Sequence, residues 1–171
     1  MIHQHTMTQL KTVQDPMKLL WSANATANTT ASTETITTTQ PTTTGGAVVF
    51  QCSSLNYLKI VPLLSTASNS PTIRVTGWTK SDTGSYWIPQ QLFYGTINAI
   101  GGAGTAISIN STNLYPVTTI TKTDGDAKIY NVSANNSGGM LLIDTLGCQL
   151  LKVEFGNTTT ASTVNAFIGA I

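Results

Sequence analysis

The stretch GMLLIDTLGCQLLKVEF, residues 139–155, decides the fold. Two short apolar runs, 139–145 and 149–155, are separated by a break that contains Gly147. Short runs of this kind between turn residues predict β-strands. The continuous apolar run at 140–143 is typical of a strand that is buried on both faces. We therefore expect a protein built from β-strands.

The same pattern continues on the N-terminal side of this stretch and after it. Strand-like runs recur roughly every 8–12 residues between clusters of Gly, Pro, Asn and Ser, as in a sandwich or barrel. The other runs are 47–52, 57–64, 71–78, 91–100, 104–110, 116–122, 127–133 and 162–169. No stretch holds apolar residues at helical spacing for three turns. The fold class expected from this pattern is all-β.

Two parts of the chain also resemble each other. Residues 58–60, 65–70 and 72–77 parallel residues 151–153, 157–162 and 163–169, in the order strand, turn, strand. Each part resembles a hairpin, and two such hairpins would pack as facing or adjacent elements. We expect a jelly-roll-like antiparallel β-sandwich, because this arrangement closes off most sheet edges.

Residues 1–45 differ from the remainder and are expected to form an extended Thr-rich N-terminal arm or an edge strand. This segment is weakly hydrophobic and low in complexity, so that it cannot bury enough surface to fold alone. The sandwich domain is expected to span residues 46–171. Candidate contact residues in the arm are the anchor Leu19, Leu20 and Trp21, then Ile36 in a short candidate strand, and Thr44.

The chain is poor in charge. Among 171 residues there are eight Lys and Arg and seven Asp and Glu, which is 9%, against about 25% in ordinary soluble domains. A net charge of +1 gives little attraction for nucleic acid, which binds Lys and Arg along its phosphates. No segment has the roughly 18 continuous apolar residues of a membrane-spanning helix. We expect no nucleic-acid or membrane partner, and synthesis in the cytoplasm.

Groups for catalysis or metal binding are few. His3 and His5 lie in the polar start of the chain, where a general base or metal ligand would lack supporting groups. Asp124 and Asp126 flank Gly125 in a pattern typical of a hairpin turn, without the further acids of a calcium loop. We expect no enzyme activity, no metal and no cofactor.

Cys52 and Cys148 are the only cysteines, too few for a disulfide scaffold or a zinc site. Both are expected to be buried thiols in strands. A bridge between them would require that the two strands are neighbours in an oxidising medium, which the sequence does not decide.

Residues 77–92, GWTKSDTGSYWIPQQL, are the most distinctive stretch of the chain. Trp78 ends one predicted strand, an Asp-Thr-Gly-Ser turn follows, and Trp87 opens the next segment. Trp78, Tyr86 and Trp87 either pin the loop to the core or offer a platform on which a sugar ring stacks. Pinning to the core is the favoured interpretation.

A set of positions beginning in this stretch resembles a known family. These are Gly77, Trp78, Trp87, Ile88, Pro89 and Leu92, then Gly147, Leu151, Lys152, Val153, the Thr-rich 158–160 and the closing strand 164–168. In order and spacing they resemble small head proteins of tailed bacteriophages, over residues 47–171.

The resemblance implies a capsid decoration (cement) protein, with a jelly-roll-like domain that binds the outside of an icosahedral head. The implied partners are the major capsid protein and further copies of the chain, in a trimer rather than a dimer. The implied location is the exterior of the virion. Two other functions fit the same residues: a carbohydrate-binding head-fibre or tail domain that uses the three aromatic residues, and a sandwich-fold coat protein.

Overall fold

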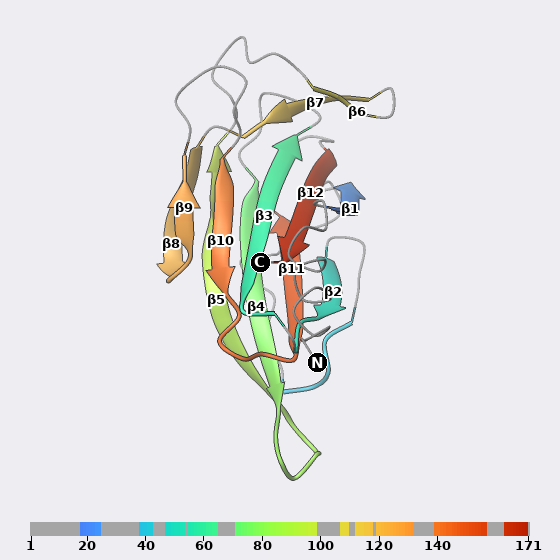
Figure 1. The fold of residues 1–171 in the computed structure, drawn as a ribbon, viewed down its shortest axis with the longest axis vertical. Helices are drawn as coiled ribbons and strands as arrows, with labels where there is room; N and C mark the ends of the chain where they lie inside the picture. Colours follow the sequence, from blue (N-terminus) through green and yellow to red (C-terminus); the bar gives the residue numbers. More distant parts are fainter. Residues whose placement is uncertain are drawn as a thin grey trace, which may run out of the picture.

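The computed structural model describes residues 18–24, 38–42, 47–53, 55–64, 71–98, 107–109, 112–117, 119–131, 139–156 and 163–170. These residues contain no helix, and their strands form two antiparallel sheets that pack face to face (Figure 1). The described part has no helix that is long and apolar enough to cross a membrane. The expected all-β sandwich is confirmed.

The first sheet has the order β1-β12-β3-β10-β9, and β7 pairs with β3 and with β6. Its strands are β1 (Lys18–Asn24), β3 (Tyr57–Leu64), β6 (Ile107–Ile109), β7 (Thr112–Pro116), β9 (Lys128–Tyr130), β10 (Met140–Asp144) and β12 (Thr163–Ala170). The second sheet has the order β2-β11-β4-β5-β8. Its strands are β2 (Ala47–Gln51), β4 (Thr72–Lys80), β5 (Trp87–Asn98), β8 (Thr119–Gly125) and β11 (Leu150–Gly156).

Four of the antiparallel pairs are nested within one another along the chain. The outermost pair is β1 with β12, and inside it lie β2 with β11, β3 with β10 and β4 with β5. Successive pairs alternate between the two sheets, since β1–β12 and β3–β10 lie in the first sheet and β2–β11 and β4–β5 lie in the second. The chain is thus arranged like one long hairpin folded over into two layers.

The two similar parts of the sequence are adjacent, but neither is a hairpin. β3 lies in the first sheet and β4 in the second, whereas β11 lies in the second sheet and β12 in the first. Instead, β3 pairs with β12 and β4 pairs with β11. The reason is that Leu58 and Ile60 of β3 share one core cluster with Ile73 and Val75 of β4, so these strands must face each other across the core.

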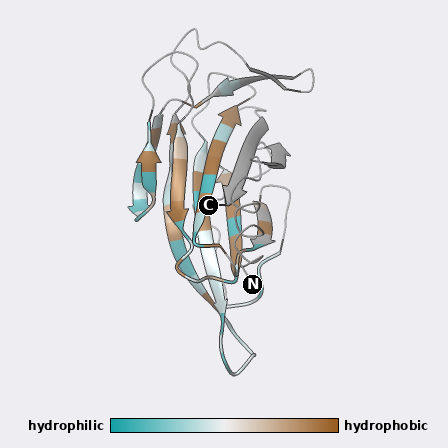
Figure 2. Ribbon diagram, in the orientation of Figure 1, coloured by the Kyte–Doolittle hydropathy of each residue, from teal (hydrophilic) through white to brown (hydrophobic). Residues whose placement is uncertain are grey.

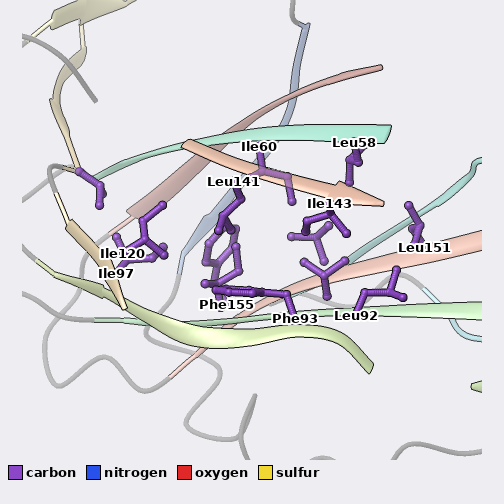
Figure 3. Close-up of a cluster of buried hydrophobic side chains, with 14 of the residues drawn as sticks. Leu58, Ile60, Leu92, Phe93, Ile97, Ile120, Leu141, Ile143, Leu151 and Phe155 are labelled. Atoms are coloured by element: carbon purple, nitrogen blue, oxygen red, sulfur yellow. The ribbon is translucent and has the colours of Figure 1, made fainter. Parts of the chain in front are cut away.

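The core lies between the two sheets. The largest fully buried apolar side chains include Phe93 and Phe155, and Figure 3 shows them together with Leu141 of the opposite sheet. Figure 2 shows hydrophobic residues, in brown, on β3, β10 and β11. At about 25 cal/mol per Å² of apolar area, this burial is the main source of folding free energy.

Most strand predictions are confirmed, and three details are wrong. β5 begins at Trp87, earlier than the predicted 91, because it forms the second arm of a long hairpin with β4. The run 116–122 is divided between β7 and β8. The run 140–143 is buried on one face only, since Met140 and Leu142 are half-buried, whereas all seven residues of β11 are buried.

Part of the expected arm belongs to the sandwich. Leu19 and Trp21 lie in β1, at the edge of the first sheet, where β1 pairs with β12 from Lys18 opposite Ile168 to Asn24 opposite Thr163. Ile36 and Thr44 lie outside the described residues. Residues 38–42 are described, and most of them are exposed.

The pairing of β1 gives a first prediction, on truncated chains. Deleting residues 1–24 removes six paired positions and leaves β12 as an unprotected sheet edge. Ladder hydrogen bonds each contribute about 0.5–1.5 kcal/mol, so we expect a loss of about 2 kcal/mol or more, which lowers the melting temperature by roughly 4–8 °C. Calorimetry and light scattering measure this loss and the accompanying aggregation. Deletion of residues 1–17 is the control, and equal melting temperatures of the two truncated chains would contradict the prediction.

Candidate functional site

The hairpin formed by β4 and β5 is the most prominent feature of the surface. Figure 1 shows its tip extending past the ends of the other labelled strands. Two backbone hydrogen bonds close the turn: the Ser81 N–H donates to the Tyr86 carbonyl at 2.9 Å, and the Gly84 N–H donates to the Ser81 carbonyl at 3.0 Å. Gly84 has a φ of 75°, which an L side chain rarely adopts. The turn is therefore well defined by its sequence.

The three aromatic residues of this stretch separate into different environments. Trp78 is 4% exposed, so it cannot serve as a stacking platform. It lies on the same face of β4 as Arg74 and Thr76, which points away from the core. Tyr86 is 61% exposed. Trp87 is half-buried, and the Lys80 ammonium lies 6.0 Å from the centre of its ring, at the outer limit of a cation–π contact. The structure brings only Tyr86 and Trp87 together at the tip.

Ile88 completes the apolar surface of the tip and was not predicted. It is 56% exposed, and because it lies two residues after Tyr86 on an extended chain, both side chains face the same side. In the sequence, the spacing of two residues between Tyr86 and Ile88 is the signal that could have identified Ile88. Five large apolar side chains of the described residues are exposed: Tyr57, Tyr86, Ile88, Tyr130 and Leu146.

Among the described residues, the first part of β5 has a paired strand on one side only. β4 pairs with β5 from Lys80 opposite Trp87 onward, whereas β8 pairs with β5 only from Phe93. Pro89 has no N–H to donate, as is typical of an edge strand. At Trp87 the backbone N–H donates to the Thr38 carbonyl at 3.0 Å. The segment 38–42 thus lies against the base of the tip.

A buried ion network lies on the central strands of the second sheet. Glu154 is directly opposite Arg74 in the register, and its Oε2 is 2.8 Å from an Arg74 guanidinium nitrogen. Its Oε1 is 2.8 Å from the Lys152 ammonium, two residues along β11 on the same face. All three side chains are buried, on the face of the sheet that points away from the core.

The two cysteines are neighbours, and both are free thiols. Cys52 Sγ donates a hydrogen bond to the Cys148 carbonyl at 2.8 Å. Burial, and secondarily the nearby Cys148, raises the pKa of Cys52 from 9.0 to about 11. Burial also raises the pKa of Cys148, while a hydrogen bond with Thr79 opposes this. Both thiols are protonated at neutral pH and are weak nucleophiles.

A metal ion in a protein is typically held by three or more His, Cys, Asp or Glu side chains. Within the described ranges, no three His, Cys, Asp or Glu side chains are grouped closely enough to bind one. His3 and His5 lie outside these ranges.

No family model, curated protein or solved structure matches the chain.

The Cys52 thiol gives a prediction for alkaline pH. Its pKa is higher in the folded protein than the ordinary value of 9.0, so the folded state disfavours the thiolate that the unfolded chain forms. The stabilising contribution is complete below about pH 9 and is lost as the pH rises toward about 11. Urea denaturation at several pH values should show that the wild-type chain loses stability faster over this interval than Cys52→Ala. Parallel curves for the two chains would contradict the prediction.

The ion network gives a prediction for stability. Glu154→Gln leaves Arg74 and Lys152 buried without their countercharge, which costs about 3–5 kcal/mol when a buried partner is removed. Denaturant titration measures the loss. Asp126→Asn, which changes an exposed carboxylate, is the control and should change stability by about 0.5 kcal/mol or less. A loss below about 1 kcal/mol for Glu154→Gln would show that the network is not held together by charge.

Proposed function

We propose that the chain is a viral capsid decoration protein, which binds the outside of an icosahedral head and stabilises contacts between major capsid subunits. In this proposal the domain is a jelly roll, and the tip of the β4–β5 hairpin is the part that contacts the capsid.

The nested strand pairing is the observation that carries the proposal. A jelly roll has eight strands in two four-stranded sheets and contains two Greek keys, and viral capsid and lectin domains are built on it. Here β1-β12-β3-β10 and β2-β11-β4-β5 are two such rows of four, with first paired to last and second paired to second last. The strands β6 to β9 lie between the fifth and sixth strands of this roll in sequence.

The surface of the hairpin tip supports a contact with another protein. Fold alone does not assign function, so a site must support it. Tyr86 and Ile88 are 61% and 56% exposed and lie together on an element that projects from the sandwich. Aromatic residues are enriched and charged residues depleted at the centres of protein interfaces. Tyr86 and Ile88 therefore suit the centre of an interface, and the exposed Lys80 and Asp82 of the same hairpin suit its polar rim.

The low charge of the chain supports the same role. With only 9% charged residues, most of the surface is uncharged, and such a surface is brought into contact with a neighbour at little desolvation cost for charged groups. A protein that binds the assembled shell but not separate subunits stabilises the shell by mass action. Many identical contacts of moderate strength suffice for this.

Co-sedimentation with capsids that lack the protein tests the proposal. We expect the wild-type chain to sediment with capsids at a fixed stoichiometry, as a small discrete oligomer by light scattering. The double variant Tyr86→Ser/Ile88→Ser should bind at least about tenfold more weakly, because loss of a central anchor costs about 1.4 kcal/mol or more. Tyr130→Ser is the matched control, since Tyr130 is 45% exposed but lies on β9.

The outcomes separate the alternatives. Failure of the wild-type chain to bind capsids would refute the decoration role, and assembly of the chain alone into shells would identify a coat protein. Undiminished binding by the double variant would refute the assignment of the contact to the hairpin tip.

A further inference from the structure

A cleft opens on the flank of the sandwich, between strands of the two sheets. It has a volume of about 260 Å³, and four segments that are distant in sequence line it. These are Tyr57 at the start of β3, Gln90–Leu92 of β5, Gly125–Lys128 at the β8–β9 turn, and Leu142–Asp144 of β10 with Leu146. This volume is slightly below the roughly 300–1,000 Å³ of sites for drug-sized ligands. The cleft therefore suits a ligand the size of one sugar ring.

The floor of the cleft is apolar and its mouth is flanked by apolar groups. Leu92 and Ile143 are buried and form part of the core cluster, and Ala127 packs against it. Tyr57 and Leu146 are 42% and 56% exposed, so two of the five exposed large apolar side chains belong to this one cleft. The exposed phenol ring of Tyr57 is a surface on which the C–H face of a sugar stacks.

The backbone holds Leu146 in an unfavourable conformation. Its φ is 49°, in the left-handed region, and it is the one non-glycine among the described residues with a positive φ. Its N–H donates to Asp144 Oδ1 at 2.9 Å, and the adjacent Thr145 hydroxyl donates to the Leu55 carbonyl at 2.6 Å. Such strain persists only where surrounding contacts impose it, and it is concentrated at binding sites.

The polar groups of the rim are mainly hydrogen-bond acceptors. Gln91 Nε2 donates to Asp124 at 2.5 Å, which fixes the side-chain amide of Gln91. Asp144 accepts the Leu146 N–H with Oδ1. Asp126 is exposed at the same rim. Lys128 is the cation among the lining residues and offsets part of the negative charge.

We propose that this cleft binds a single pyranose residue of a neutral carbohydrate. A pyranose presents several hydroxyl donors around an apolar ring face, which matches carboxylate and amide acceptors beside an aromatic ring. A lysine or arginine side chain would also reach the carboxylates and pack its stem on Tyr57, but it would lie beside the Lys128 ammonium, whereas a neutral sugar meets no like charge. The cleft is separate from the hairpin tip. The proposal that it binds a sugar does not depend on the proposed capsid role.

Ligand-observed NMR and calorimetry with methyl pyranosides of glucose, galactose, mannose and N-acetylglucosamine test the proposal. At least one of these probes should bind the full chain. Tyr57→Ala should raise its dissociation constant at least about tenfold, which corresponds to about 1.4 kcal/mol, and Asp126→Asn should raise it less. Tyr130→Ala, which changes an exposed tyrosine on β9, is the control and should leave the constant unchanged.

Three results would overturn the proposal: no binding of any pyranoside, binding that Tyr57→Ala does not weaken, or tighter binding of lysine or arginine amide than of every sugar. Unchanged melting temperatures show that the variants are folded. Tyr57→Ala should still sediment with capsids, so that failure of the sugar site and failure of the decoration role are distinguished by separate measurements.

Discussion

The antiparallel pairing of β4 with β11 is the constraint on which the remaining structure depends. Both strands are central in the second sheet, and β11 is buried along its whole length. One face of the β4–β11 pair supplies core residues such as Val75 and Val153. The other carries the Arg74–Glu154–Lys152 network, in which charge must be compensated because it is buried. This network favours one register, since a shift of β11 by one residue would turn Glu154 into the apolar core and Val153 out of it.

The positions of strands could be predicted from the sequence because each strand carries a local signal. Short apolar or alternating runs between turn residues locate β3 and β11 at almost their observed bounds. Pairing has no comparable local signal, because it is decided by which strands can share a core. The similar parts at 58–77 and 151–169 were therefore correctly related to each other and wrongly interpreted as hairpins. Connections of seven residues (β3 to β4) and six residues (β11 to β12) fit a crossing between sheets as readily as a turn within one.

The candidate sites could be predicted only where their residues are close in sequence. The stretch 77–92 was recognised as distinctive because Trp78, Tyr86 and Trp87 lie within ten residues, but burial then separates Trp78 from the other two. The cleft gave no sequence signal. Tyr57, Gln91, Asp126 and Leu146 are brought together by strands of both sheets, and each residue alone is an ordinary surface residue.

Both candidate surfaces follow from the difference in length between β5 and β8. β8 ends at Gly125, opposite Phe93, so the part of β5 before Phe93 has β4 as its one strand neighbour among the described residues and becomes the projecting hairpin. The same termination turns the chain from β8 toward β9 of the first sheet, and this turn forms one wall of the cleft. Gly125 is required there, because its φ is 91° and a Cβ would collide with the backbone of Leu92 and Phe93. A larger residue would push the turn away from β5, widening the cleft while leaving the hairpin intact.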